Sequence, residues 1–315
     1  PVNAVFGFCN MLLKLIEDIQ MEKGGEVSIA VIFDAARETF RNEIYSDYKA
    51  NRSDPPEDLK PQFDLIKKVP EAFNLQSIEL LGFEADDLIA SYSNEASKLG
   101  RKVTIISADK DLMQLLTKEV SIIDPMKKKE ITKETVMEKF GVLPDKVIDV
   151  QALAGDSSDN VPGVPGIGPK IASQLINEYG SVEELIKKVD SIKQEKRRNS
   201  IIDNKDLAII SKKLVTLKQD VPLPLDIEKL EFKPLDVNKL LNFLDEMEFN
   251  RIKASVISKY GNSSIKQEQK KYDKNDEYNF YLPLNEKINN ENYDLIDNEN
   301  SLIEWIEIVK DYGLV

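Results

Sequence analysis

The sequence lacks histidine altogether and contains a single cysteine, Cys9. Without histidine there can be no Ser-His-Asp or Cys-His catalysis and no zinc site with imidazole ligands. One cysteine allows neither an internal disulfide nor a cysteine-rich zinc site, and its neighbours Phe8 and Leu12 indicate a buried, unreactive thiol. Acid–base chemistry must therefore come from carboxylates, lysine, tyrosine or metal-bound water.

Long apolar runs are missing as well. No stretch is long enough to cross a membrane, and the N-terminal residues show no signal-peptide pattern. A lone cysteine fits a reducing compartment, so we expect a cytoplasmic protein with no membrane partner, and we expect a monomer. The length of 315 residues suffices for roughly two domains with a buried core.

Basic residues are fewer than acidic ones: the sequence has 43 Lys+Arg and 56 Asp+Glu, which give a net charge of −13. Taken alone, this argues against a nucleic-acid-binding protein. Residues 261–315 carry −6 of that charge, with 6 basic and 12 acidic residues, which leaves −7 for residues 1–260. If about eight of the remaining carboxylates surround divalent ions, that part is close to neutral, and local basic patches for DNA are compatible with it.

Hydrophobic periodicity predicts alternating helices and strands in the first part of the chain. Apolar positions indicate helices over 4–19, 63–75 and 85–99, and β-branched runs indicate strands at 27–33, 77–81, 102–107 and 120–124. This order predicts an α/β fold with a mostly parallel central sheet flanked by helices. From 132 to about 255 the pattern is mostly helical, and the polar stretch 261–280 is typical of a linker.

Acidic residues follow the ends of several expected strands. They are Asp34, Asp109 and Asp111, with Glu84, Asp86 and Asp87 between a third strand and its helix. Carboxyl ends of parallel strands meet at one edge of a sheet, so these groups should converge and repel one another unless hard divalent cations, Mg²⁺ or Mn²⁺, neutralise them. A further pair, Asp156 and Asp159, is three residues apart in GDSSDN. The alternative for single acids is helix capping or turn formation, which alone could explain Asp86 and Asp87.

A glycine-containing loop and a basic segment provide candidate phosphate contacts. In NVPGVPGIGPK the pattern Gly166-Ile167-Gly168, followed by Lys170, is typical of a helix-hairpin-helix, in which backbone N–H groups approach a DNA phosphate without reading sequence. Such a loop can also coordinate a monovalent cation through its carbonyl groups. Upstream lies a basic segment with interleaved aromatics, which predicts a clamp on DNA phosphates; its basic residues are Arg37, Arg41, Lys49 and Arg52. The alternative is a solvated amphipathic helix.

Four segments in order resemble the 5′-nuclease domain of bacterial DNA polymerase I, whose superfamily includes phage and eukaryotic flap endonucleases. They are FDAARETFRNEIYSDYKANR, GFEADDLIA, ISADKDLMQL and LAGDSSDNVPGVPGIGPKIA, and the resemblance runs from residue 1 to about 260. It implies a PIN-like 5′-nuclease fold over 1–131 with a helical helix-hairpin-helix subdomain over 132–260. A small PIN-type ribonuclease is the lesser alternative, because it would be much shorter and lack the GDSSDN–GIG segment.

The resemblance also implies roles for individual residues. Two or more Mg²⁺ or Mn²⁺ ions would be ligated by Asp34, Glu84, Asp86, Asp87, Asp109, Asp111, Asp156 and Asp159. Catalytic positioning of the scissile phosphate would fall to Lys49 and Arg52. DNA contacts are implied for Arg41, Lys49, Arg52, Gly163, Gly166, Gly168 and Lys170, with K⁺ a further ion at the loop.

The implied activity is metal-dependent 5′–3′ exonuclease and 5′-flap endonuclease cleavage. Its partners would be DNA with a free 5′ end, flap or nick, and RNA primer–DNA junctions, in replication and repair. The family begins with a strand ending in Asp-Gly, and this sequence begins after it, so we expect an N-terminally truncated domain with an open quadrant in the metal site. A non-catalytic DNA-binding remnant is the alternative. At the other end, 281–315 resembles the start of a 3′–5′ exonuclease-like domain.

Overall fold

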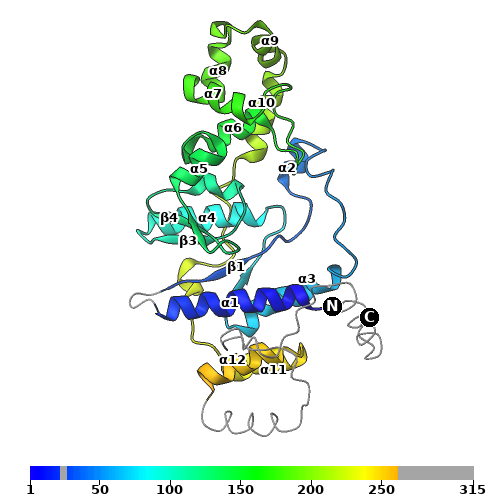
Figure 1. The fold of residues 1–315 in the computed structure, drawn as a ribbon, viewed down its shortest axis with the longest axis vertical. Helices are drawn as coiled ribbons and strands as arrows, with labels where there is room; N and C mark the ends of the chain where they lie inside the picture. The colour runs from blue at the N-terminus through cyan, green and yellow to red at the C-terminus, as the bar shows by residue number, and fades with distance from the viewer. Residues whose placement is uncertain (22–26, 262–315) are drawn as a thin grey trace, which may run out of the picture. The chain divides into compact units, whose positions relative to one another are not determined.

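The computed structural model describes residues 1–21 and 27–261 (Figure 1). The expected linker, apart from Gly261, and the expected domain start at 281–315 lie outside the described residues. The elements are α1 (Asn3–Met21), β1 (Ala30–Ile32), α2 (Phe40–Ile44), α3 (Lys60–Ala72), β2 (Gln76–Ile78), α4 (Ala85–Lys98), β3 (Val103–Ile106), η1 (Asp111–Leu115), β4 (Val120–Asp124), β5 (Lys129–Ile131), α5 (Lys133–Phe140), η2 (Pro144–Lys146), α6 (Val147–Ala154), α7 (Pro169–Tyr179), α8 (Val182–Lys187), η3 (Val189–Ser191), α9 (Glu195–Asp203), α10 (Lys205–Val215), η4 (Ile227–Leu230), α11 (Val237–Glu246) and α12 (Asn250–Tyr260).

Helix α1 packs against α3 through the apolar face that the sequence predicts. Its residues Cys9 and Ile16 are fully buried, as helical spacing requires for one face. The first turn is capped from outside: the buried Gln62 of α3 accepts from the Ala4 N–H at 2.8 Å and donates to Asn3 Oδ1 at 3.0 Å. One side chain thus satisfies a free helix N–H group and joins the two helices.

The strands form two sheets within the described residues rather than the one continuous sheet that the pattern suggested. β1 pairs in parallel with β2, Ala30 opposite Gln76, and β3 pairs in parallel with β4, Val103 opposite Val120. Helix α4 contacts both β1 and β3. The strand indicated at 27–33 is shorter than its apolar run, since β1 has three residues, and all three are only half-buried although such a run is typical of a strand buried on both faces.

The sequence did not predict the short strand β5, because the strand begins at the last residue of the lysine run 127–129. β4 and β5 are antiparallel, and the turn between them places Lys128 at φ 51°. Asp124 fixes this turn by accepting from the N–H groups of Met126 (2.9 Å) and Lys127 (3.1 Å). These backbone bonds to the ionised form lower the pKa of Asp124.

The largest apolar core crosses the expected boundary at 131/132. Ile105 and Ile122 of the strands belong to the same buried cluster as Leu153 of α6 and Ile176 of α7. The helical region is therefore not separated from the strands by solvent, and elements on both sides can hold side chains in fixed positions around a shared site. Within residues 1–21 and 27–261, every helix is too short or too polar to span a bilayer.

We expect Cys9 to be unreactive in the folded protein. The thiol is fully buried on the inner face of α1, and burial raises its pKa to about 12, so the reactive thiolate is scarce at neutral pH. An aromatic disulfide reagent at pH 8 should label Cys9 only after urea is added. Labelling of the native protein at the rate of the unfolded chain would contradict the packing of α1.

Candidate metal and phosphate site

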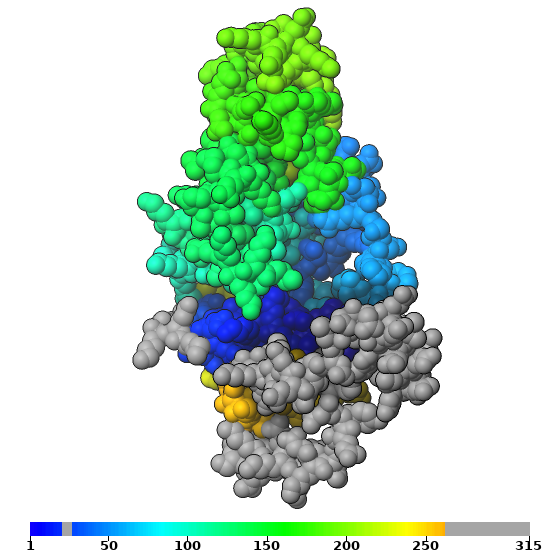
Figure 2. All heavy atoms as spheres, viewed as in Figure 1, coloured from blue at the N-terminus to red at the C-terminus, as the bar shows by residue number. Residues whose placement is uncertain are grey.

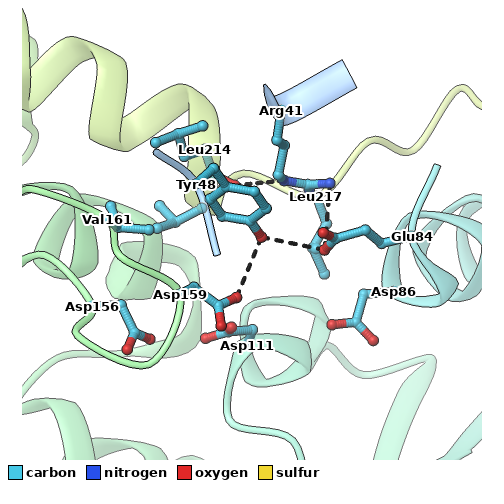
Figure 3. A pocket seen from close by; sticks show the side chains of 11 residues that line it. Arg41, Tyr48, Glu84, Asp86, Asp111, Asp156, Asp159, Val161, Leu214 and Leu217 are labelled. Carbon is cyan, nitrogen blue, oxygen red and sulfur yellow. Dashed lines mark hydrogen bonds and ion pairs between the residues drawn. The ribbon is translucent and has the colours of Figure 1, made fainter. Parts of the chain in front are cut away.

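Acidic side chains from three separate stretches of chain surround one pocket (Figure 3). Glu84 and Asp86 come from the start of α4, Asp111 from the start of η1, and Asp156 and Asp159 from the loop after α6. The remaining lining residues are Arg41, Tyr48, Val161, Leu214, Val215 and Leu217. The structure thus brings together five of the eight acids predicted to ligate metal.

Two more predicted acids border this cluster. Asp34 follows β1, and its Oδ1 accepts from the N–H of Ala85 at 2.7 Å, in the first turn of α4. Asp109 follows β3, and its Oδ1 accepts from the N–H of Asp111 at 2.9 Å. Asp34 thus lies beside the start of α4 and Asp109 beside η1, but they do not follow strands of one sheet as expected, because β1 and β3 belong to different sheets.

One half of the site holds acids that form no ion pair among the described residues. No lysine or arginine in the described ranges forms an ion pair with Asp34, Asp86, Asp109 or Asp111. Burial, and then the charges of Asp109 and Glu84, raise the pKa of Asp86 to about 8. Burial also raises the pKa of Asp111 to about 6, against a 2.6 Å hydrogen bond from Gln151 Nε2 that favours the charged form.

In the other half, basic side chains neutralise the acids. Lys49 Nζ lies 2.7 Å from Glu84 Oε1 and 3.6 Å from Asp159 Oδ2. Arg52 Nη2 lies 2.5 Å from Asp159 Oδ1. Lys49 and Arg52, predicted to position the scissile phosphate, therefore lie at the acids and beside the pocket.

Lys110 completes this neutralised half from a different segment. Its ammonium forms an ion pair with Asp156, although it stands in sequence between Asp109 and Asp111. Asp156 is itself buried, and its Oδ1 accepts a hydrogen bond from the Ser158 N–H at 2.9 Å. From the sequence, Lys110 was only one residue of the motif ISADKDLMQL, with no predicted role.

Tyr48 is a second site residue that sequence reasoning did not single out. Its hydroxyl lies 3.3 Å from both Glu84 Oε2 and Asp159 Oδ2, so it bridges acids from two segments (Figure 3). Burial, followed by the charge of Glu84, raises the pKa of Tyr48 well above its ordinary range. The phenol stays protonated and acts as a hydrogen-bond donor to these carboxylates.

Backbone and side-chain hydrogen bonds hold the segment that carries Lys49 on the Asp159 loop. Figure 2 shows this part of the chain, in lighter blue, beside the green helical region. Lys49 has φ 57°, and its N–H donates to the Asp159 carbonyl at 2.9 Å. Asn51 Nδ2 donates to the Ser157 carbonyl, and Asn160 Nδ2 to the Asp47 carbonyl, both at 2.6 Å. A left-handed lysine costs backbone energy, so the position of its ammonium is imposed by the surroundings.

Asp87 and Arg41 are placed differently from the prediction. Arg41 is 1% exposed and forms a two-pronged pair with the fully buried Asp87, at 2.7 and 2.8 Å. The Asp87 carboxylate also accepts from the Lys218 N–H (2.9 Å) and the Glu84 N–H (3.2 Å). Arg41 is therefore not available to a DNA phosphate, and Asp87 lies beneath the pocket, where the capping alternative describes it correctly.

Gly163 is likewise a support, not a surface contact. It is buried with φ 61°, and a Cβ there would lie 2.4 Å from the Gly155 N atom. Gly155, with φ 72°, meets the Val161 carbonyl in the same way at 2.5 Å. The two glycines let the chain cross itself on either side of Asp156 and Asp159, which fixes the loop between them.

The hairpin loop beyond Gly163 presents backbone to solvent. Val164 and Ile167 anchor it in the core, while Gly166, Gly168 and Lys170 are exposed. A Cβ at Gly166 or Gly168 would meet nothing within 4 Å, and Gly168 is the N-cap of α7, with Pro169 at the first helical position. The arrangement leaves room for a phosphate at the N-terminal end of α7.

The chemistry of the site fits a hard divalent cation, because all the donors are carboxylate oxygens. The acids without ion-pair partners also repel one another, and a bound cation would relieve this repulsion. As they stand, no three acids of the described residues are grouped closely enough to hold an ion. Lysine and arginine occupy the oxygens of Glu84, Asp156 and Asp159 instead. Side-chain rotation and exchange of these partners would be needed for ligation.

Comparison with known families decides the identity of the chain. The 5′-3′ exonuclease N-terminal resolvase-like domain matches residues 1–141, and the 5′-3′ exonuclease C-terminal SAM fold matches residues 142–238. The chain belongs to the 5′-3′ exonuclease family. Relatives in this family include DNA polymerase I of Rhizobium leguminosarum, 52% identical over 258 residues, covering 81% of this chain and 25% of the polymerase. The 5′-3′ exonuclease of Aquifex aeolicus is 41% identical over 256 residues, covering 81% of this chain and 86% of the relative.

Solved structures show the same fold for the family. T5 5′-exonuclease, in a structure with divalent metal ions (zinc), superposes with a TM-score of 0.57 at 22% identity, over 80% of this chain and 89% of that one. The catalytic core of Rad2, in complex with DNA substrate, gives 0.54 at 14% identity over 80% and 82%. The α/β fold with a helical second region is thereby confirmed.

Replacement of Asp87 by Asn should destabilise the protein rather than empty a metal site. The Asn cannot balance the buried Arg41 charge, so we expect a loss of about 3–5 kcal/mol in the free energy of unfolding, measured by urea titration in EDTA. Removal of the exposed pair Lys14–Asp18 is the matched control and should leave stability nearly unchanged. Full stability with weakened Mn²⁺ binding in Asp87→Asn would instead make Asp87 a ligand.

The two positive-φ glycines of the hairpin should respond differently to alanine. Gly163→Ala forces a methyl group onto the Gly155 backbone, and we expect a loss of more than about 2 kcal/mol in the free energy of unfolding. Gly166→Ala meets open space and should cost only about 1 kcal/mol for its left-handed conformation. Equal losses in urea titrations would contradict the crossing of the chain at Gly155 and Gly163.

Proposed function

We propose that this chain hydrolyses DNA phosphodiesters as a divalent-metal-dependent 5′–3′ exonuclease and 5′-flap endonuclease. The observation that carries the proposal is the convergence of acids from three stretches of chain beside Lys49 and Arg52. Structural roles do not require so many poorly neutralised carboxylates in one place, because unpaired buried charge is unfavourable. Membership of the 5′-3′ exonuclease family supports the same activity.

Two or more Mg²⁺ or Mn²⁺ ions fit the site better than softer metals, because the donors are oxygen atoms only. Bound divalent ions would supply an activated water and stabilise the leaving 3′ oxygen. Asp34, Glu84, Asp86, Asp109, Asp111, Asp156 and Asp159 would hold them. The T5 5′-exonuclease structure with zinc supports a divalent requirement without fixing the metal.

Lys49 and Arg52 would exchange their carboxylate partners for the scissile phosphate. Both lie against Asp159, so they are within reach of a phosphate bound over the ions. Their positive charge would offset charge that develops on the phosphate oxygens. Tyr48 would keep Glu84 and Asp159 in place during this exchange, since it donates a shared proton to both.

The exposed hairpin would hold the duplex away from the cut. Backbone N–H groups at Gly166 and Gly168 and the ammonium of Lys170 would contact phosphate, and the carbonyl groups could bind K⁺. The contact would be independent of sequence. The Rad2 structure in complex with DNA substrate supports DNA as the ligand of this fold.

The substrates that fit are 5′ flaps, nicks and RNA primer–DNA junctions, in primer removal and repair. The chain spans about a quarter of the polymerase relative and most of the separate A. aeolicus exonuclease, so the module can work inside a polymerase or alone. We propose a monomer in the cytoplasm. No feature of the described residues or of the relatives favours the non-catalytic alternative.

The activity is tested with a 5′-labelled flap duplex in Mg²⁺, with a blunt duplex lacking the flap and an EDTA reaction as controls. We expect release of the flap, loss of cleavage in EDTA, and loss of cleavage in Asp86→Asn, which removes charge with little change of shape.

Lys49→Ala should lower the rate at saturating DNA about a hundredfold. Lys170→Ala should weaken DNA binding and its salt dependence but leave that rate unchanged. No cleavage in Mg²⁺ or Mn²⁺, or cleavage that persists in EDTA, would refute the proposal.

A further inference from the structure

Lys110 occupies a position that neither the fold nor the proposed chemistry explains. It stands between two unneutralised acids, Asp109 and Asp111, yet its ammonium reaches across to Asp156 on another segment. About a third of the Lys110 side chain remains exposed, whereas Asp156 is almost completely buried. A lysine recruited only for solubility would extend into solvent, because ordering its chain costs entropy.

We propose that Lys110 is a built-in counter-ion that competes with divalent cations for Asp156. The inference rests on the proposed metal-dependent function. An ammonium and a divalent cation cannot share the buried Asp156 carboxylate without repelling each other. The lysine would therefore hold the Asp156 loop in place when metal is scarce and would weaken ion binding at this half of the site.

The local geometry distinguishes Lys110 from the other basic residues of the site. Lys49 and Arg52 contact Asp159 from the segment that would bind phosphate, so substrate gives them a new partner. Lys110 belongs to the acid-bearing turn itself, which starts η1. When it leaves Asp156 it remains beside Asp109 and Asp111, so its charge continues to oppose metal at the neighbouring oxygens.

The unneutralised half supplies the contrast. Asp86 and Asp111 form no ion pair with a basic residue in the described ranges, and burial, followed by the charges of neighbouring acids, raises the pKa of Asp86. A cation entering there gains the relief of that repulsion. A cation entering at Asp156 must first displace an ammonium ion. Lys110 would thereby make the two halves unequal in affinity.

The test measures metal binding directly and needs no DNA or turnover. Mn²⁺ is titrated into the full chain, and free Mn²⁺ is counted by electron paramagnetic resonance. Lys110→Gln should tighten the weaker class of Mn²⁺ sites about three- to tenfold, while Lys110→Arg, which keeps the charge, should bind as the wild type does. Thermal unfolding in EDTA should show Lys110→Gln to be less stable than the wild type, and Mn²⁺ should stabilise it more.

A matched control is available at Lys127, which pairs at 3.4 Å with the nearly buried Asp124 away from the pocket. Lys127→Gln removes the same charge from the protein and should leave Mn²⁺ binding unchanged. In an Asp156→Asn background Lys110→Gln should change Mn²⁺ binding much less than in the wild type, because the contested carboxylate is gone and only the charge of Lys110 beside Asp109 and Asp111 remains. Equal or weaker Mn²⁺ binding in Lys110→Gln would overturn the inference. Absence of Mn²⁺ binding in every variant would instead overturn the proposed metal-dependent function.

Discussion

Repulsion among carboxylates is the constraint on which the rest of this structure depends. The chain brings acids from the ends of β1 and β3, the start of α4 and the loop after α6 to one place, and each addition makes the next less favourable. The protein meets this cost in two ways. It pairs Glu84, Asp156 and Asp159 with lysine and arginine, and it leaves Asp86 and Asp111 with raised pKa values.

The scaffold beneath the site is built to resist that repulsion. The buried pair of Arg41 and Asp87 joins α2 to the start of α4, and the Arg41 Nε atom also donates to the Leu214 carbonyl at 2.7 Å. The pair therefore ties three segments together directly under the acids. At the other side, the contact of Gly155 with Gly163 closes the loop that carries Asp156 and Asp159. Both features exclude other conformations of the site. The buried Arg41 charge requires Asp87 as its partner, and the close contact of Gly155 with Gly163 leaves no room for a side chain.

The sequence was sufficient to predict most of the elements and to identify most of the acids that converge, because apolar spacing and the position of an acid after a strand are local patterns. Helix α1 follows from the spacing of its apolar residues, and Asp34 and Asp109 are found by asking which acids follow strands. The division into two sheets was not predictable, because hydrogen-bond pairing between strands distant in sequence leaves no local pattern. The short β1 shows the same limit, since its apolar run predicted neither how many residues pair nor how deeply they are buried.

What the sequence concealed about the site was the partner of each charge. Arg41 and Arg52 look alike in a basic, aromatic segment, yet one is buried against Asp87 and the other lies half in solvent against Asp159. The difference arises because the Arg41 side chain on α2 faces α4 and α10, contacts that only the folded chain defines. Tyr48 was hidden for the same reason, since its two acceptors come from segments 36 and 111 residues away.

These pairings also resolve the conflict between an acidic chain and a DNA ligand. A net charge of −13 predicts repulsion from DNA at long range, but binding depends on the charges that face the phosphate. Lys49 and Arg52 are held at the acids and are therefore partly neutralised before anything binds. On the proposed function, cations that take over Glu84 and Asp159 release this positive charge toward the substrate. Metal and DNA would then favour each other's binding, because each provides a new partner for a group that the other displaces.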